Sequence, residues 1–378
     1  MNKHDTPLMS DVQYCARCCM PETSEGTIFD EMGICRACIS SEQKMHINWL
    51  DRKKKLEEIL DKFRESSGDN YDCLVPISGG KDSVFQLHML VKIYKMKPLA
   101  VTFNHNWYTE TGQYNLWNIL EKLNVDHIMF TPNRGLINNI AKQSLHMIGD
   151  SCWHCHAGVG SFPLQAAIRF KIPLIIWGES IAEAGNKATY MDNGGEPIPF
   201  DEEYYLKVSS KVRPQEMICD SITSKDLYPF KLPSKEEVKS AGIYGIHLGD
   251  YMFWDGEKQV NFIKKEYGWK EDYVEGTYKG YKSVECKMSG VHDHAKFVKR
   301  GFGRTTDHVS QDVRNGLMSR EEAFQLVREI ETKQPEGLPN YLNITEFSEK
   351  EFYEILKSHR DKKIDFSEVD EAIEKNKS

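Results

Sequence analysis

The sequence lacks the features of a membrane or exported protein. No apolar run among its 378 residues approaches the about 20 residues that a membrane helix needs. The first residues, Met1–Thr6, contain no apolar core of the kind found in signal peptides. A net charge of −8 provides no general attraction to nucleic acid. We therefore expect a cytoplasmic protein without membrane contact, and nucleic acid is not an expected partner.

A disulfide framework is also not expected. Ten cysteines in a cytoplasmic protein indicate metal or redox chemistry more than disulfides. The length exceeds that of one domain of roughly 100–200 residues, so we expect two or three units. A hydrophobic content of 40% and a charged content of 28% are typical of globular proteins.

The segment Ser78–Ser83 (SGGKDS) has the composition of a phosphate-binding loop. Gly79 and Gly80 allow backbone N–H groups to approach an anion, and a helix N-terminus behind them favours negative charge. Ser78, Lys81 and Ser83 add hydroxyl and ammonium donors. A Walker A loop is absent, because Val75 and Asp82 stand where that motif needs Gly and Ser or Thr. The loop instead resembles the PP-loop (SGGxDS) of ATP-pyrophosphatases, which implies an adenylating enzyme that uses ATP with Mg²⁺.

From Tyr71 onward, short apolar runs alternate with helical patterns. This alternation predicts a parallel sheet covered by helices on both faces, with ligands at the carboxyl ends of the strands. The predicted strands are 72–77, 99–103, 127–130 and 172–177, and the predicted helices lie near 83–95, 111–123, 135–148 and 158–170. Charged amphipathic helices are predicted over 319–331 and 346–374.

Four units are expected along the chain. They are a zinc ribbon over 11–40, a linker helix over 41–68, an ATP-pyrophosphatase domain over 69–260 and a mostly helical substrate-binding region over 261–378. In the linker helix, the apolar stripe that we expect to be buried comprises Trp49, Leu50, Leu56, Ile59, Leu60 and Phe63.

Two cysteine pairs near the N-terminus predict a structural zinc site. Cys15, Cys18, Cys35 and Cys38 form two C-x₂-C pairs separated by sixteen residues, a spacing typical of zinc sites. Four thiolates suit tetrahedral Zn²⁺, which would supply folding energy to a segment too small for its own core. Cys19 is a spare that could replace Cys18 as a ligand.

The pair Cys152 and Cys155, with His154 and His156 around it, leaves four interpretations open. It could be a second metal site with one of the histidines, an iron–sulfur site completed by Cys219 or Cys286, a redox or nucleophilic thiol pair, or a structural pair. Its place just before a core helix, near the predicted active edge of the sheet, modestly favours function.

Further candidate residues follow the predicted strands. Gly178 permits close backbone approach to a ligand, and Glu179 beside it could orient a hydroxyl, hold Mg²⁺ or act as a base. An ordinary strand-exit turn explains the pair equally well. Phe103, Lys296 and Arg304 complete the set that we predict to bind ATP.

A basic stretch follows residue 279 in this acidic chain. Its cations suit an anion such as pyrophosphate or a sugar carboxylate, although a solvated surface is the default interpretation. They are Lys279, Lys282, Lys287, Lys296, Lys299, Arg300 and Arg304, with Arg314 nearby. The aromatic residues Trp254, Tyr278 and Tyr281 could stack on a sugar ring, although core packing is the more common role.

Four segments together resemble the N-acetyl sugar amidotransferases of bacterial surface-polysaccharide and flagellin-glycan biosynthesis. They are Tyr14–Pro21 (YCARCCMP), Ser78–Ser83, Pro173–Glu179 (PLIIWGE) and Gly301–Asp307 (GFGRTTD). The resemblance implies conversion of an acetamido group to an acetamidino group on a nonulosonic acid, such as pseudaminic or legionaminic acid, or on a nucleotide-linked sugar of lipopolysaccharide. Lys81, Asp82, Glu179, Cys152 and Cys155 are then the predicted catalytic residues.

The chain contains no convincing glutaminase motif. Ammonia would therefore come from free ammonium or from a separate glutaminase–cyclase partner, as the resemblance implies for some family members. The rival enzyme class is tRNA thiolation, which shares a PP-loop, a zinc ribbon and a mid-chain CxxC pair. A third class, a zinc-ribbon adaptor that binds nucleotide without cleaving it, is disfavoured by the intact loop.

Overall fold

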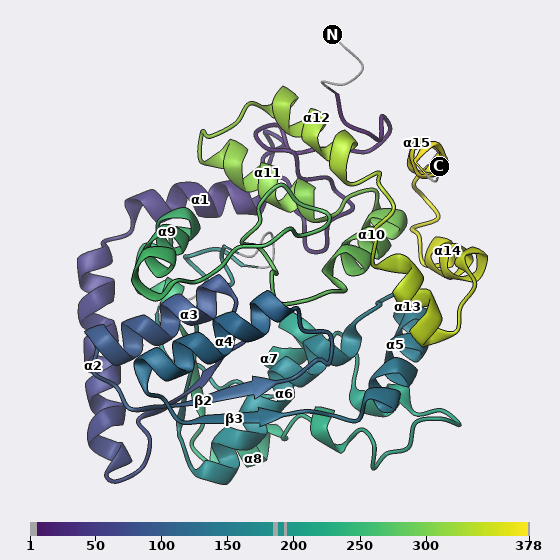
Figure 1. Cartoon of the computed structure of the whole chain (residues 1–378). Helices are drawn as coiled ribbons and strands as arrows, with labels where there is room; N and C mark the ends of the chain where they lie inside the picture. Colours follow the sequence, from purple (N-terminus) through teal and green to yellow (C-terminus); the bar gives the residue numbers. More distant parts are fainter. Residues whose placement is uncertain (1–5, 184–187, 193–194, 377–378) are drawn as a thin grey trace.

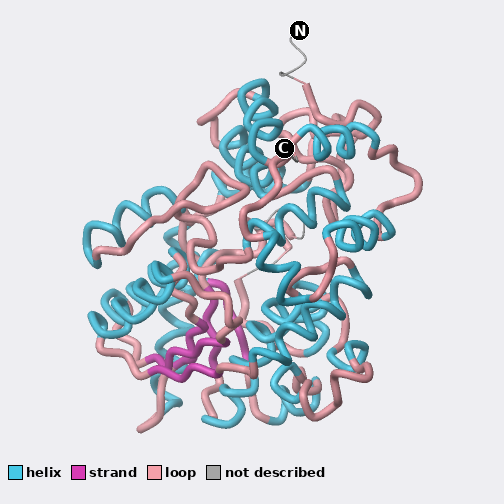
Figure 2. The backbone as a smooth tube through the Cα atoms, turned by 45° about the vertical axis from the view of Figure 1, so that its right-hand side comes forward, coloured by secondary structure: helices cyan, strands magenta, loops and turns pink. Residues whose placement is uncertain are grey.

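A computed structural model describes residues 6–183, 188–192 and 195–376 of the chain (Figure 1). At its centre lies a five-stranded parallel sheet in the order β3-β2-β1-β4-β5, coloured in Figure 2. The strands are β1 (Cys73–Pro76), β2 (Pro98–Phe103), β3 (His127–Phe130), β4 (Leu174–Trp177) and β5 (Tyr244–His247). The predicted parallel α/β class and its first four strands are confirmed.

Alternate residues of the strands pack against two different groups of helices. The helices of the core are α2 (Trp49–Ser67), α3 (Lys81–His88), α4 (Glu110–Leu123), α5 (Arg134–Ile148), α6 (Trp153–Phe170) and α9 (Gly256–Tyr267). Leu74 and Val101 join the apolar cluster of α5 and α6, whereas Val75 and Ala100 join that of α2, α3, α4 and α9. Burial on both faces explains why the central strands β1, β2 and β4 are continuous apolar runs rather than alternating ones.

The structure corrects several expected element boundaries. The N-terminal helical segment is divided into α1 (Arg36–His46) and α2, because the Asn48 side chain accepts hydrogen bonds from the Leu50 and Asp51 backbone N–H groups and starts a new helix. The side chain of Leu50 is 73% exposed, so its assignment to the buried stripe was wrong. After α3, the helix continues as one π-helical turn, Met89–Ile93.

The C-terminal region is helical, as predicted, but its last helix is interrupted. The remaining helices are α7 (Glu202–Tyr205), α8 (Lys235–Ser240), α10 (Ser289–Arg300), α11 (Arg304–Arg314), α12 (Arg320–Ile330), α13 (Leu338–Thr345), α14 (Glu349–Ser358) and α15 (Ser367–Lys375). Between α14 and α15, the Arg360 guanidinium donates two hydrogen bonds to the Asp370 carboxylate, at 2.9 and 2.7 Å. This bidentate pair folds α15 back, and the predicted single helix over 346–374 was therefore wrong.

The N-terminal segment packs against the C-terminal helices rather than standing apart. It lies beside α11 and α12 (Figure 1), where the Arg320 guanidinium donates to the carbonyl oxygens of Cys15 and Cys18 at 2.8 and 2.9 Å. Tyr14 and Phe324 meet edge to face with ring centroids 5.6 Å apart. Chain ends that are far apart in sequence thus form one layer above the carboxyl edge of the sheet.

Candidate functional site

The loop after β1 forms the predicted turn into α3. Gly79 has a φ of +85°, and a Cβ there would lie 2.7 Å from the Gly112 carbonyl oxygen, so this position requires glycine. The Gly80 N–H donates to Ser78 Oγ at 3.2 Å, and the Ser78 N–H donates to Ser83 Oγ at 3.3 Å. The two serine hydroxyls therefore hold the loop in shape as well as offering donors to a ligand.

Lys81 is buried behind the loop and pairs with Asp82. Its side chain is only 3% exposed, and the Asp82 carboxylate also accepts a hydrogen bond from the Trp254 indole at 3.2 Å. Burial disfavours a charged lysine, but the carboxylates of Asp82 and Glu179 outweigh it and raise the pKa of Lys81. The ammonium of Lys81, predicted as a donor to the phosphates, thus pairs with Asp82 in this structure and positions its carboxylate.

A cavity of about 470 Å³ opens at the carboxyl end of the sheet, beside the loop. Several predicted site residues line it, namely Ser78, Gly80, Asp82, Ser83, Phe103, Cys152, Cys155, Gly178, Glu179 and Arg304. Its apolar wall contains Ile77, Val101, Val159, Pro163 and Trp177, which suits a nucleobase. We call it the loop cavity.

Two carboxyl groups in the loop cavity have raised pKa values. Burial, followed by repulsion from Asp82, raises the pKa of the Glu179 carboxyl. Burial also raises the pKa of Glu285, which lines the same cavity and lies against Gly80. The pKa of Lys282 is lowered by burial and by the nearby Lys81 ammonium. Carboxylates shifted in this way at a cavity are candidates for proton transfer.

Glu285 and His247 are among the residues of the loop cavity that were not predicted as site residues. Glu285 follows no strand or motif, and it reaches the loop because its backbone carbonyl accepts a 3.1 Å hydrogen bond from Thr109 N–H at the start of α4. His247 ends the short strand β5 and lies 2.8 Å from the Glu179 carbonyl oxygen. The strand β5 (YGIH) combines a glycine, a histidine and an exposed tyrosine, so it gives no apolar run that a sequence pattern would reveal.

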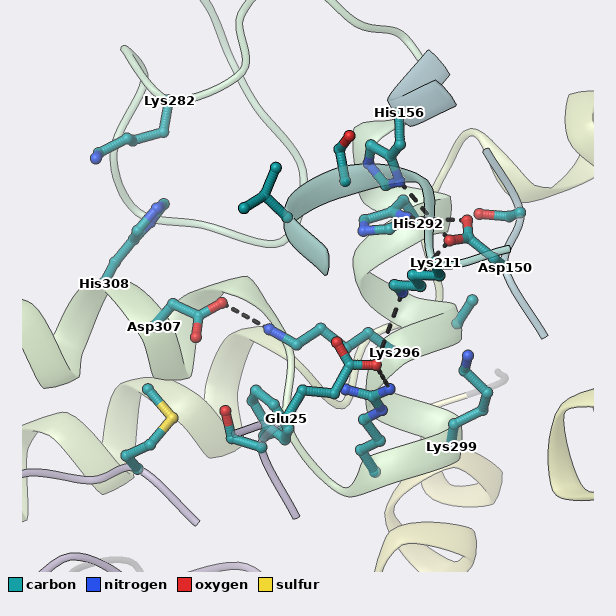
Figure 3. Close-up of a pocket in the computed structure, with 18 of the residues that line it drawn as sticks. Glu25, Asp150, His156, Lys211, Lys282, His292, Lys296, Lys299, Asp307 and His308 are labelled. Atoms are coloured by element: carbon teal, nitrogen blue, oxygen red, sulfur yellow. Dashed lines mark hydrogen bonds and ion pairs between the residues drawn. The ribbon is translucent and has the colours of Figure 1, made fainter. Parts of the chain in front are cut away.

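A second cavity of about 410 Å³ is rich in cations (Figure 3). We call it the cationic cavity. Its basic residues are Lys211, Lys282, Lys296, Lys299, Arg300 and Arg314, and its acidic residues include Glu25, Asp150, Glu179, Glu183 and Asp307. Lys296 lines the cationic cavity and not the loop cavity. It was predicted to bind ATP, which we expect at the loop cavity. Burial lowers the pKa of Lys299 to about 8.

The rest of the basic stretch has structural roles or faces solvent. Lys279 is buried between Glu257 and Asp312, at 3.0 and 2.8 Å, and Lys287 is exposed. The aromatic residues Trp254 and Tyr281 are buried in the core, which is the more common role of aromatic side chains. Lys211, on a different segment from the basic stretch, was missed because an isolated lysine carries no motif.

The two cavities are adjacent, because four residues line both of them. These are His156, Glu179, Ser209 and His292. A ligand at the loop and an anion at the cationic cavity would therefore meet at this shared wall. The N-terminal segment reaches the same place, since Glu25 in the cationic cavity pairs with Arg300 and lies 3.8 Å from Lys211 Nζ.

The pair Cys152 and Cys155 lies at the start of α6, in the wall of the loop cavity. Cys152 Sγ is 3.0 Å from His292 Nδ1 and 3.9 Å from His156 Nε2. In the described residues, the metal-ligating groups of this region that come together are Cys152, His156 and His292, without Cys155 or Cys286. His154 is buried against the Trp107 ring, so of the two histidines considered only His156 joins Cys152.

The four N-terminal cysteines converge on one point. All four are buried, and their sulfur atoms lie within 4.8 Å of one another. Cys15 Sγ is 3.7 Å from Cys38 Sγ, and Cys18 Sγ is 3.8 Å from Cys35 Sγ. Metal–sulfur bonds of about 2.3 Å around one tetrahedral ion separate the sulfurs by about 3.8 Å, so the site fits a single ion. Cys19 lies outside it, with its sulfur near the Arg320 carbonyl oxygen.

In the part of the chain that the structure describes, no helix combines the length and apolar character needed to cross a membrane.

Residues 275–377 match the family model of the C-terminal domain of WbpG-like LPS biosynthesis proteins, which supports the resemblance to glycan-biosynthesis proteins. This matched region contains α10 and α11 and therefore most of the cations of the cationic cavity.

Two solved structures are distantly similar. The U34-tRNA thiolase NcsA from Methanococcus maripaludis, with its 4Fe–4S cluster, has a TM-score of 0.37 and 14% identity over 89% of both chains. The NMN synthetase from Francisella tularensis has a TM-score of 0.28 and 13% identity, and the alignment covers 60% of this chain and 98% of that one.

A relative in Methanocaldococcus jannaschii, the uncharacterized protein MJ1599, is 30% identical over 290 residues, which is 77% of this chain and 83% of the relative. With this identity over most of both sequences, the chain belongs to the same family as MJ1599.

Proposed function

We propose that the protein is an ATP-dependent amidotransferase that converts the acetamido group of a bacterial surface sugar into an acetamidino group. The observation that carries the proposal is the shared wall of the loop cavity and the cationic cavity. In this proposal the loop cavity binds the nucleotide, and the adjacent cationic cavity binds an anion. The region that matches the WbpG-like family model includes α10 and α11, which line the cationic cavity. This match supports a sugar of lipopolysaccharide or a related glycan as the anion.

The reaction needs both sites at once, because an amide oxygen is a poor leaving group. The acetamido oxygen attacks the α-phosphorus of ATP, the bond from that phosphorus to the bridging oxygen breaks, and pyrophosphate leaves. Ammonia then attacks the activated carbon, the carbon–oxygen bond breaks, and AMP departs with the former amide oxygen. The loss of two protons leaves the neutral amidine.

The residues of the loop cavity have matching roles. The Gly79–Gly80 turn and the α3 N-terminus bind the phosphates, and Phe103 with its apolar neighbours contacts the base. Asp82, held by Lys81, offers a carboxylate oxygen of the kind that Mg²⁺ prefers, and bound Mg²⁺ would neutralise phosphate charge. Glu179, which lines both cavities and has a raised pKa, accepts a proton from the attacking ammonia.

The cationic cavity holds the sugar. Lys296 and Arg300 lie on α10, and their side chains are only 23% and 25% exposed. Cations enclosed in this way suit a single carboxylate or diphosphate, whereas a polyanion such as tRNA requires an open basic surface. This arrangement favours sugar modification over the alternative of tRNA thiolation.

The N-terminal cluster is proposed to hold Zn²⁺ in a structural role. Four buried thiolates at single-ion spacing leave no open coordination position. The Cys15 sulfur also accepts backbone hydrogen bonds from Arg17 and Cys35, at 3.4 and 3.3 Å, as expected for a thiolate.

The proposal is tested by incubating the purified protein with ATP, Mg²⁺ and ¹⁵N-ammonium. Acceptors are N-acetylated nonulosonic acids, nucleotide-linked N-acetyl sugars and bulk tRNA. Mass spectrometry should show the acetamido oxygen replaced by ¹⁵NH in one sugar, with equimolar AMP. When that acetamido group carries ¹⁸O, the label should appear in AMP. The Asp82→Asn variant serves as the inactive control, and AMP formation with tRNA alone would refute the sugar assignment.

A further inference from the structure

We propose that Cys152, His156 and His292 form a second metal site, for Zn²⁺ or a similar divalent transition ion, in the wall between the two cavities. Cys152 precedes α6, His156 lies one turn into that helix, and His292 lies on α10. One sulfur and two imidazole nitrogens converge to within 4.8 Å of one another. Thiolate and imidazole are the ligands that Zn²⁺ prefers.

The spacing of these atoms suits one tetrahedral ion. Zinc bonds of about 2.3 Å to sulfur and about 2.0–2.1 Å to nitrogen place the two donor atoms about 3.6 Å apart. The Cys152 sulfur lies 3.0 Å from His292 Nδ1 and 3.9 Å from His156 Nε2, on either side of that value. The side chains of His156 and His292 are partly exposed, at 35% and 25%, which leaves the imidazoles room to rotate toward an ion.

Asp150 supports the site as an outer carboxylate. Its Oδ2 lies 3.7 Å from His156 Nδ1, the nitrogen opposite the proposed ligand atom. A carboxylate in this position fixes the orientation of a metal-bound histidine. Asp150 is held in place by the Cys152 N–H, which donates to Oδ1 at 2.9 Å, and Oδ2 is a buried oxygen without a hydrogen-bond partner.

A nucleophilic cysteine triad fits the same residues less well. In such a triad, the histidine uses one nitrogen for the thiol and the other for the carboxylate. His156 lies between Cys152 Sγ and Asp150 Oδ2 in this way, at 3.9 and 3.7 Å. A triad gives no role to His292, however, whose Nδ1 is nearer to the same sulfur, at 3.0 Å. A metal site uses both histidines.

Three protein ligands leave the fourth position of the ion open, as in catalytic zinc sites. His156 and His292 line both cavities, so this position faces the place where the two ligands meet. We infer that it takes water or an oxygen of the acceptor, and this part rests on the proposed function. The binding of the ion itself is independent of the proposed function.

Metal analysis of the purified full-length protein tests the site without ATP or acceptor. After reconstitution with Zn²⁺ and removal of excess metal, the wild type should retain one zinc equivalent more than Cys152→Ser, His156→Gln or His292→Gln. Reconstitution with Co²⁺ should give a sulfur-to-cobalt absorption band, and the contribution of this site should be lost in Cys152→Ser. Circular dichroism identifies any variant that fails to fold. If one variant fails, the zinc content of each folded histidine variant still tests the site.

Cys155→Ser and Cys219→Ser are the matched controls, and both should keep the additional zinc. Equal zinc content in the wild type and in folded His156→Gln and His292→Gln would overturn the proposal. Iron with inorganic sulfide that is lost in Cys155→Ser but kept in His292→Gln would also overturn it, in favour of an iron–sulfur site. Because metal content is measured without substrate, failure of the amidotransferase assay would leave this result unaffected.

Discussion

The Arg314 guanidinium lies 3.9 Å from the Cys18 sulfur and also lines the cationic cavity. One side chain of α11 thus contacts both the four-cysteine cluster and the proposed sugar site. Its positive charge offsets the charge of the thiolates. The N-terminal segment is consequently a wall of the site, which Met20 and Glu25 also line, and its folding should affect the binding of the sugar.

Loss of the N-terminal metal should release this segment. In Cys38→Ser the cluster lacks one ligand, and a segment with little core of its own loses its folding energy. We expect limited proteolysis between residues 11 and 35 to accelerate at least about tenfold, which corresponds to about 1.4 kcal/mol of local stability. Cys219→Ser, outside the cluster, is the control. Equal cleavage rates in the two variants would contradict a structural metal.

Substitution of Gly79 should disable the loop. Gly79→Ala imposes a positive φ on an L-residue and a 2.7 Å contact with a backbone oxygen, which should cost about 1–3 kcal/mol and abolish AMP formation. Gly268→Ala is the matched control, because Gly268 also has a positive φ but no atom within 4 Å of its added Cβ. Gly79→Ala should therefore unfold at a lower temperature and release less AMP than Gly268→Ala. Similar AMP release by the two variants would contradict a phosphate-binding turn.

Glu179→Gln should reduce kcat without preventing ATP binding. Loss of a general base costs about 10²–10⁴-fold in rate, and the neutral amide is close in shape to the carboxyl group. Because burial and Asp82 raise the pKa of Glu179, the wild-type rate should fall on acidification as this base is protonated. Glu203→Gln, an exposed position that lines neither cavity, should preserve kcat. An unchanged kcat in Glu179→Gln would exclude the base role.

Lys296→Met should weaken acceptor binding selectively. Lys296 lines the cationic cavity, where Asp307 accepts a hydrogen bond from it at 2.7 Å. A lost charged hydrogen bond of about 1.5–3 kcal/mol should raise the KM for the sugar about 10- to 100-fold and leave the KM for ATP unchanged. The exposed Lys287→Met is the control. A raised KM for ATP instead would place the nucleotide in this cavity.

Glu331 should make stability depend on pH. Burial raises its pKa to about 7 from an ordinary value near 4.5, so the folded state holds the proton more tightly than the unfolded state. This carboxyl therefore makes the free energy of unfolding decrease as pH rises from about 4.5 to 7, by at most about 3 kcal/mol. Glu331→Gln should flatten this part of the profile in denaturant titrations, while Glu329→Gln should retain the wild-type slope.

Sequence patterns revealed the elements whose signals are local. The loop Ser78–Ser83 and the first four strands were recognisable, because a glycine pair between an apolar run and a helical period is a contiguous pattern. The Cys15–Cys38 spacing likewise indicated a metal site. Strand β5 was missed because its sequence, Tyr244–His247 (YGIH), is not a continuous apolar run. The break between α14 and α15 was missed because an Arg360–Asp370 pair produces no periodic signal.

The sequence alone determined the parallel α/β core and the turn that follows its first strand, because glycine geometry and apolar runs act over a few neighbouring residues. Only the tertiary structure decided which distant groups share a wall. His292 reaches Cys152 across 140 positions, and Glu285 reaches Gly80 across the loop cavity. Such contacts depend on how helices pack onto the sheet, and packing is set by the whole core rather than by any one segment.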